Sequence, residues 1–258
     1  MPRTPSTVFL MYHELELPGR PLCQDDPGYV RYIISADEFA AQMQQIHDLG
    51  LRGVSVTDAL KFAEPAACIT FDDGCETDFL RAAPALKELG FGATFYVVSG
   101  FIGKTGYLSI AQLLQLQSQG FEIACHSMSH PYLTDLDQAG LQREIADAKT
   151  MLEQMLGAPV QHFSCPGGRY DERVVQVAKR AGYQTVATSI PRANTAATDP
   201  FALARVAIIR GMKGSEFQRI CRGKSLWQAA LTMGARDRVK KLLGNRLYDR
   251  MRGLLLKR

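Results

Sequence analysis

Short apolar segments rich in β-branched and aromatic residues alternate along the chain with longer segments whose apolar residues recur at helical spacing. Strands and helices in regular succession are typical of an α/β sheet or barrel. The predicted strands cover residues 8–12, 53–56, 67–71, 94–98, 122–125, 162–165, 185–187 and 205–209. The predicted helices cover residues 36–49, 78–89, 110–119, 141–156 and 172–181. Residues 18–32, with three prolines and two glycines, predict an irregular loop.

The ends of the predicted helices support this interpretation. Ser35 and Ser109 are expected to cap two helices, because a serine side chain accepts a hydrogen bond from the first helical turn. A glycine, which favours the left-handed conformation at a helix end, follows each predicted helix: Gly50, Gly90, Gly120, Gly157 and Gly182. About seven strand–helix units in roughly 200 residues predict a distorted (β/α) barrel with about seven parallel strands. An open doubly wound sheet is the alternative, disfavoured because no glycine-rich nucleotide motif follows a strand.

Charge is divided unevenly along the chain. The net charge of the 258 residues is +4, but residues 1–210 hold 17 Lys and Arg against 23 Asp and Glu, and residues 211–258 hold 13 against 3. We therefore expect a mildly acidic barrel domain over residues 1–210 and a basic, largely helical extension over residues 211–258. The extension either docks on the barrel or contacts anionic lipid at a membrane surface. No nucleic-acid recognition motif accompanies its charge, so nucleic-acid binding is not expected.

The first residues lack the long apolar region and small-residue cleavage site of a secretory signal, and no window approaches about 18 apolar residues. These features predict a cytoplasmic protein. The six cysteines form no CxxC pair, so reduced thiols are expected. Cys75, Cys125 and Cys165 lie close to the motifs described below. We expect them to be buried as small apolar side chains, and a role as metal ligand or nucleophile is the alternative.

Two carboxylates follow the predicted strand 67–71, in the sequence Asp72-Asp73-Gly74. The carboxyl ends of strands are where α/β folds bind ligands. Adjacent carboxylates repel each other unless a cation or a proton compensates their charge. The pair therefore predicts a metal site in which one Asp is a ligand and the other a base. A simple turn is the alternative.

Two histidines, His126 and His130, follow the predicted strand 122–125. Imidazole nitrogens at this spacing can bind one metal ion. Two histidines with one aspartate leave open coordination positions, which is the arrangement of a catalytic site rather than a structural one. A metal that lowers the pKa of water, with a carboxylate beside it to accept the proton, predicts hydrolysis of an acyl bond.

A third loop contains Pro166-Gly167-Gly168 and follows the predicted strand 162–165. Alone it would be an ordinary turn, and its position beside the other two motifs gives it significance. Glycine lets the backbone approach a ligand, so a backbone N–H of this loop is a candidate donor to an oxyanion.

Together these residues resemble the NodB-homology polysaccharide deacetylases of carbohydrate esterase family 4. Residues 70–74, Thr-Phe-Asp-Asp-Gly, are similar to the first family motif, and residues 126–130, His-Ser-Met-Ser-His, to the second. The resemblance covers about residues 6–210 and implies a distorted (β/α) barrel. It also implies that Asp72 is the catalytic base and that Asp73, His126 and His130 hold a divalent metal, usually zinc.

The third loop departs from this family. Ser164 stands where the family motif has an Arg that orients the base, so Arg169 or Arg205 is expected to enter the site from elsewhere. Gly167 stands where the motif has an aromatic residue, and its backbone N–H can still bind the oxyanion. We expect Arg169, in the same loop, and Tyr12, at the end of the first predicted strand, to contact the oxyanion or the substrate.

The general-acid His that the family carries late in its domain is also missing, because no His follows His162. His13, directly after the first predicted strand, is the candidate acid, since an ordinary His pKa of about 6.5 suits proton donation. A structural His that bonds to the neighbouring loop is the alternative. His47 and His162 are expected to be structural.

The resemblance implies a hydrolase that removes an N-acetyl group from a sugar or polysaccharide intermediate, with metal-activated water and Asp72 as base. The alternatives are removal of an O-acetyl group, hydrolysis of a C–N amide bond outside sugars, and a sugar-binding module with lost or weak turnover. A cytoplasmic enzyme would meet its N-acetylated glycan as a lipid-linked or nucleotide-linked sugar, during exopolysaccharide biosynthesis. If the extension binds lipid, we expect the enzyme at the inner face of the membrane.

Overall fold

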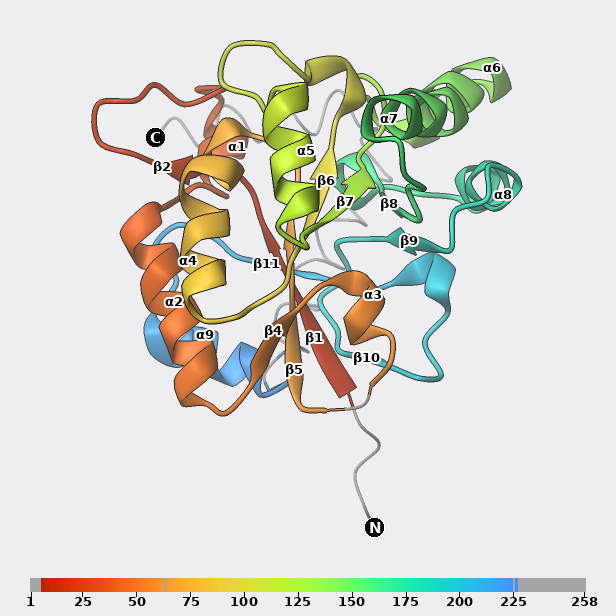
Figure 1. The fold of residues 1–258 in the computed structure, drawn as a ribbon. Coiled ribbons are helices and arrows are strands. Elements are labelled where there is room, and N and C mark those ends of the chain that lie inside the picture. The colour runs from red at the N-terminus through yellow and green to blue at the C-terminus, as the bar shows by residue number, and fades with distance from the viewer. Residues whose placement is uncertain (1–5, 63, 225, 227–258) are drawn as a thin grey trace.

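The computed structural model describes residues 6–62, 64–224 and 226. Nine strands form the main sheet, and helices cover its outer side (Figure 1). The strands are β1 (Ser6–Tyr12), β2 (Leu15–Glu16), β3 (Ile34–Ser35), β4 (Arg52–Val54), β5 (Ala66–Phe71), β6 (Thr94–Val97), β7 (Glu122–Cys125), β8 (His162–Ser164), β9 (Thr185–Ala187), β10 (Asn194–Thr195) and β11 (Val206–Ala207). The α-helices are α1 (Pro27–Val30), α2 (Ala36–Asp48), α3 (Val56–Ala59), α4 (Ala83–Glu88), α5 (Ile110–Ser118), α6 (Gln138–Leu141), α7 (Ala148–Leu156), α8 (Glu172–Arg180) and α9 (Gly214–Cys221). Wider helical turns, η1 (Asp78–Ala82) and η4 (Gln142–Asp147), lead into α4 and α7.

The main sheet closes on itself. Its order runs β10-β1-β5-β6-β7-β8-β9, with β4 beside β5 and β11 beside β1, and every pairing except that of β1 with β10 is parallel. The returning segment 203–208 bonds to β9, at one end of this order, and to β1, next to the other end. Leu203 N–H donates to Val186 O at 2.9 Å, and Ile208 N–H donates to Met11 O at 3.0 Å. The distorted barrel that the sequence predicts is therefore confirmed, and the open doubly wound alternative is wrong.

The two faces of the strands pack in different layers. Consecutive side chains of a strand point to opposite faces. A small cluster, which includes Phe9, Cys68, Tyr96 and Ala187, fills the inside of the barrel. The alternate residues, such as Phe71, belong to the larger hydrophobic cluster between the strands and the helices. The same alternation decides which residues at the strand ends face the inside.

The predicted helices and strands all have counterparts. Ser35 Oγ accepts from Glu38 N at 3.0 Å and Ser109 Oγ from Gln112 N at 3.2 Å, so both predicted caps are confirmed. The five glycines after the helices all have positive φ, between 63° and 86°. The predicted strand 53–56 ends at Val54, because Ser55 caps α3. The predicted loop 18–32 is more ordered than expected, since it contains α1, capped by the Asp26 side chain.

The part of the basic extension nearest the barrel is helical and packed. α9 lies against α2, and its Phe217 and Ile220 belong to the larger hydrophobic cluster. Residue 225 and residues 227–258 of the predicted extension lie outside the described residues, so the domain boundary at residue 210 and the lipid contact stay predictions. Within the described part of the chain, no helix has the length and apolar character needed to cross a membrane.

Candidate active site

Asp72 and Asp73 lie where β5 ends. Asp72 N–H donates to Tyr12 O at 2.9 Å, which extends the pairing with β1 by one step. In a continuing strand the two carboxylates would point to opposite faces. Asp73 instead has φ of 79°, which ends the extended conformation and lets both carboxylates face the same site. They are 3% and 4% exposed.

Arg205 holds Asp72 from two strands away, since β11 pairs with β1 and β1 pairs with β5. It lies on the segment that closes the sheet, directly before β11, and is 0% exposed. Its Nη1 donates to Asp72 Oδ1 at 2.6 Å and its Nη2 to Asp72 Oδ2 at 2.8 Å. Nη2 also donates to Ser164 Oγ at 2.7 Å, and the guanidinium lies 5.2 Å from the ring centre of Tyr96. The prediction that Arg169 or Arg205 replaces the missing Arg is confirmed for Arg205.

This ion pair controls the charge of Asp72. Burial alone raises the pKa of a carboxyl group, but the charge of Arg205, the nearby His126 and the hydrogen bonds from Arg205 outweigh it. The resulting pKa of Asp72 lies well below its ordinary value. Asp72 is therefore ionised at neutral pH, with both oxygens oriented by the guanidinium.

Asp73, His126 and His130 converge beside this pair. Asp73 Oδ1 lies 3.6 Å from His126 Nε2 and 3.4 Å from His130 Nε2, and the three candidate ligand atoms lie within 4.8 Å of one another. Asp73 Oδ1 is buried and has no hydrogen-bond partner among the described residues. An unpartnered carboxylate oxygen facing two imidazole nitrogens fits a divalent metal ion. The structure thus brings together all three residues that the resemblance assigns to the metal.

His126 is prepared to act as a ligand. Its Nδ1 lies 2.8 Å from Ser164 O, which fixes the proton on Nδ1 and leaves the lone pair of Nε2 directed at Asp73. Burial, helped by nearby His130 against the pull of the two carboxylates, lowers the pKa of His126 to about 4. The neutral ring is the form that binds metal. The side chain of His130 is 34% exposed, so the site opens to solvent on its side.

The backbone at these residues is strained. Four non-glycine residues of the described chain have positive φ, and three of them are Asp73, Ser127 and His130, at 79°, 68° and 63°. Such conformations cost of order 1–3 kcal/mol each and persist only where their surroundings enforce them. Their concentration around one point is typical of a functional site.

The loop between the two histidines is held by Glu144, from η4. Met128 N and Ser129 N donate to Glu144 Oε2 at 3.0 and 2.8 Å, and Ser129 Oγ donates to Oε1 at 2.6 Å. Ser127 Oγ accepts from His130 N at 3.0 Å. These bonds satisfy the backbone donors of the turn and fix the direction of His130.

His13 directly follows β1, the strand that pairs with β5. Its ring packs on Tyr32 at 5.1 Å between centroids, and its buried Nδ1 has no hydrogen-bond partner within the described residues. Burial lowers the pKa of His13, although Asp73 and Asp72 oppose the shift. The neutral ring therefore dominates at neutral pH, and the role of His13 as general acid stays a prediction.

The third predicted loop forms the remaining edge. Gly167 has φ of 61°, and a Cβ added to it would come within 2.9 Å of the Tyr132 ring, so only glycine fits there. The Arg169 guanidinium stacks on the ring of Tyr132, 3.5 Å from the ring centre. The roles of the Gly167 N–H and of Arg169 toward the substrate stay predictions.

The side chain of Tyr12 lies away from the site. Its ring is 1% exposed and faces the helices, where it stacks on Phe71 at 5.3 Å and meets Phe39 edge-on at 5.1 Å. Its hydroxyl donates to Gln42 Oε1 at 2.8 Å. The predicted contact of this side chain with the substrate is wrong, because Tyr12 occupies an outward position of β1 and His13 follows where the strand has ended.

Three residues of the site escaped the sequence reasoning. Ser164 was noted only as the replacement of an Arg, yet its hydroxyl joins Arg205 to Asp72, to which it donates at 3.4 Å. The Tyr96 ring packs against the Arg205 guanidinium, and its position among the inward residues of β6 could have predicted that it faces the site. Glu144 carried no signal, since it belongs to an ordinary amphipathic pattern.

Three comparisons with known proteins agree with this geometry. A family model described as polysaccharide deacetylase matches residues 60–186. YxkH of Bacillus subtilis, which its name assigns to the polysaccharide deacetylases, is 33% identical over 187 residues, 70% of this chain and 67% of that protein. A peptidoglycan-N-acetylglucosamine deacetylase of Bacillus cereus is 32% identical over 48% of this chain, which spans only 56% of the relative.

The fold has solved counterparts. The deacetylase PplD of Streptococcus pyogenes, solved in complex with acetate, superposes with a TM-score of 0.75 over 85% of this chain and 99% of that one, at 23% identity. At this identity the likeness concerns the fold. Together with the relatives in sequence and the paired motifs, it leads to one assignment: the chain belongs to the polysaccharide deacetylase family, as its resemblance to the NodB-homology deacetylases predicts.

Proposed function

We propose that the chain is a metal-dependent hydrolase that removes the acetyl group from the nitrogen of an N-acetylated sugar. The observation that carries this proposal is the pairing of an ionised, buried Asp72, held by Arg205, with an unpartnered Asp73 oxygen that faces two histidines. A base and a metal-ligand set side by side at the open end of a barrel are the parts that amide hydrolysis needs.

The donor set favours zinc. Asp73, His126 and His130 would hold the ion, and one oxygen with two imidazole nitrogens leaves coordination positions open. A divalent ion held there supplies a Lewis acid for the acetyl carbonyl and lowers the pKa of water.

Asp72 is placed to accept the proton of the attacking water. Its Oδ2 lies 3.7 Å from His126 Nε2, on the side of the ligand set, while both of its oxygens are oriented by Arg205. A low pKa keeps it ionised across the range in which the enzyme would work, and Arg205 prevents it from rotating away.

The departing nitrogen needs a proton, and the oxyanion needs a donor. We assign the first role to the protonated form of His13, which burial disfavours but the charges of Asp73 and Asp72 favour by opposing the lowering of its pKa. The Gly167 N–H, at the opposite edge, is the candidate donor to the oxyanion. The exposed side of His130, between these edges, is where the sugar would enter.

The substrate class rests on the relatives. Their names include peptidoglycan-N-acetylglucosamine and chitooligosaccharide deacetylases. The basic extension, residues 211–258, supports a lipid-linked N-acetylated sugar of exopolysaccharide biosynthesis, met at the cytoplasmic face of the membrane. Sedimentation with anionic vesicles at low and high salt, with and without residues 226–258, tests the membrane part, and binding that is unchanged by truncation contradicts it.

The proposal is tested by acetate release and metal content in the same preparations. Soluble and lipid-linked N-acetyl sugars, O-acetylated sugars and a simple N-acetyl amine form the substrate panel. We expect wild-type turnover on an N-acetyl sugar, and Asp72→Asn to retain metal but lose about 10²–10⁴-fold in kcat, the range for a general base. Undiminished turnover in this variant contradicts the base. Sugar binding without acetate release supports the binding module, and turnover only of the simple amine supports the non-sugar alternative.

A further inference from the structure

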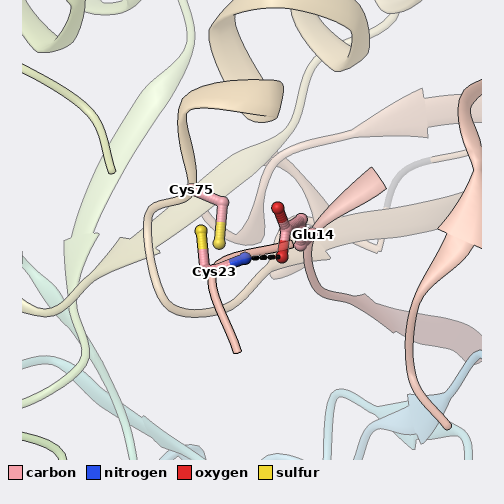
Figure 2. A group of neighbouring side chains, drawn as sticks. All are labelled: Glu14, Cys23 and Cys75. Carbon is pink, nitrogen blue, oxygen red and sulfur yellow. Dashed lines mark hydrogen bonds between the residues drawn. The ribbon is translucent and has the colours of Figure 1, made fainter. Parts of the chain in front are cut away.

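A second group of metal-ligand residues lies outside the active site. The ligand atoms of Glu14, Cys23 and Cys75 lie within 4.8 Å of one another. Figure 2 shows the two sulfur atoms facing each other, with the Glu14 carboxylate beside them. Glu14 follows β1, Cys23 belongs to the loop before α1, and Cys75 belongs to the turn after β5. Residues far apart in the chain are thus brought to one point.

We propose that these three side chains bind a thiophilic divalent cation of the zinc class, at a site separate from Asp73, His126 and His130. Zinc binds thiolate sulfur at about 2.3 Å and carboxylate oxygen at about 2.0–2.2 Å. Tetrahedral ligands at those lengths lie roughly 3.5–3.8 Å apart, so the observed group needs to contract by no more than about 1 Å. Magnesium and calcium require sets of oxygen ligands, which two sulfurs exclude.

A neighbouring carboxyl group points to the same conclusion. Asp78 is 0% exposed, and both of its side-chain oxygens lack hydrogen-bond partners among the described residues. Its N–H donates to Cys75 O at 3.0 Å, so it begins η1 directly behind the cluster. Burial raises the pKa of Asp78, and the charges of Asp73, Cys23 and Glu14 act in the same direction. Neither Glu14 nor Asp78 forms an ion pair with a Lys or Arg of the described chain, so the buried acidic groups have no protein cation to compensate them.

The surroundings of the cluster are built to enclose it. Tyr29 Oη donates to Glu14 Oε2 at 3.0 Å and lies 3.4 Å from Cys75 Sγ. Cys23 N–H donates to Glu14 Oε2 at 2.9 Å, and Cys23 Sγ donates to Gly106 O at 3.2 Å. Gly106 has φ of 89°, and a Cβ there would come within 2.8 Å of the sulfur. Glu14 and Cys75 are buried, and Cys23 is half-buried, so an ion from solvent would reach the group at Cys23.

Binding is balanced by proton release. The cation bonds to both sulfurs and to one oxygen of Glu14, and the two thiol protons leave to solvent. The hydrogen bond from the Cys23 thiol to Gly106 O is lost. The hydroxyl of Tyr29, 3.0 Å from Glu14 Oε2 and 3.4 Å from Cys75 Sγ, is the candidate for the fourth position. The bound ion would tie the loop 17–31 to the turn that carries Asp72 and Asp73, because Cys75 follows Asp73 by two residues.

Cobalt titration of the full chain tests this site. The protein is reduced with a phosphine, freed of metal with a chelator and titrated with Co²⁺. Thiolate-to-cobalt charge transfer absorbs in the near ultraviolet. The active-site ligands, Asp73, His126 and His130, contain no sulfur and cannot produce this band. We expect a charge-transfer band that saturates by two equivalents in the wild type, because the site of Asp73, His126 and His130 competes for Co²⁺. The band should be lost in Cys23→Ser/Cys75→Ser and remain in His130→Ala.

A matched control removes two other buried thiols. Cys125→Ala/Cys165→Ala keeps both cluster cysteines, and its band is expected to stay. Glu14→Gln keeps the thiols and the shape of the side chain but removes the charge, so we expect the band to form with Co²⁺ affinity at least about tenfold weaker, the lower range for disturbing a metal site. This variant keeps the test decisive if the double cysteine variant does not fold.

The proposal is overturned by no charge-transfer band in folded wild-type protein, by a band that survives Cys23→Ser/Cys75→Ser, or by unchanged Co²⁺ affinity in Glu14→Gln. A Cys23–Cys75 disulfide that persists in the phosphine and prevents binding also overturns it. None of these readouts depends on deacetylation, so this site and the proposed function stand or fall separately.

Discussion

Neighbouring residues at the carboxyl ends of the strands belong to two different chemical environments. Ser164 faces the inside of the barrel, where it contacts Arg205 and Asp72, whereas Cys165 faces the helices as part of the hydrophobic cluster. At the end of β7, His126 likewise faces the site, whereas Cys125 belongs to the outer hydrophobic cluster. One step along the chain therefore separates a charged, hydrogen-bonded interior from an apolar outer layer.

This difference teaches how the site tolerates buried charge. On the inner face, the charges of Asp72 and Arg205 neutralise each other, and each of the five N–H groups of Arg205 has an acceptor. On the outer face, burial raises the pKa of the thiol groups, to about 12 for Cys125 and further for Cys165, so these thiols stay protonated. The inner face carries chemistry and the outer face carries packing.

Arg205→Met gives the largest expected effect. Methionine keeps much of the length but leaves Asp72 buried without a counter-charge, and breaking a buried pair in this way costs about 3–5 kcal/mol in the free energy of unfolding. Burial then raises the pKa of Asp72, so the acid limb of the kcat/KM profile should move to higher pH. Urea unfolding and a pH–rate series measure both. Arg205→Lys should restore part of the stability, because it keeps the charge without the two-pronged geometry. A folded Met variant with a wild-type pH profile would contradict the role of Arg205.

The pH dependence of stability sharpens the same contrast. Because the pKa of Asp72 is depressed in the folded wild type, its stabilising contribution is present above the unfolded pKa of about 3.9 and is lost as the pH falls below it. In Arg205→Met the folded pKa is raised instead, so this group should destabilise the fold increasingly as the pH rises above about 3.9. The difference in unfolding free energy between the two proteins should therefore grow from about pH 3 to pH 7. A constant difference across that range would show that Asp72 is not the titrating group.

The sequence anticipated much of the fold because its signals are local. Alternating apolar strands, capping serines and terminal glycines each act within a few residues, and Ser35, Ser109 and Gly157 occupy the expected positions. The order of the strands followed from the preference of successive strand–helix units for a parallel barrel. What could not be read was the length of η1 and η4, whose wider turns depend on packing.

The site was predictable where motifs mark it and unpredictable where distant segments meet. Asp72, Asp73, His126 and His130 come from two short motifs, and the structure brings them together. Arg205 could be named only as one of two candidates, because its approach depends on how segment 203–208 closes the barrel. The prediction that Tyr12 contacts the substrate was wrong because every second residue of a strand points to the same face. Tyr12 shares its face of β1 with Val8 and Leu10, which belong to the outer layer.

A pair of alanine substitutions tests the contrast on β8 directly. Ser164→Ala removes the acceptor of Arg205 Nη2, and losing a hydrogen bond to a charged group should cost about 1.5–3 kcal/mol of stability and lower kcat. Cys165→Ala removes a buried sulfur from the outer layer, where the expected cost is about 1 kcal/mol and activity stays within about twofold. Unfolding curves and acetate release provide the comparison. If Cys165→Ala lowers kcat as much as Ser164→Ala does, the division into two faces fails.

Tyr12→Phe should have the smallest effect. It keeps the ring between Phe39 and Phe71 and removes only the hydroxyl that donates to Gln42, so we expect about 1 kcal/mol lower stability and unchanged kcat and KM. Gln42→Leu in the same background removes the acceptor left without a partner and should recover part of the loss, because an unpaired buried polar group costs more than a missing pair. A rise in KM for Tyr12→Phe, without a change in stability, would instead place the hydroxyl at the substrate.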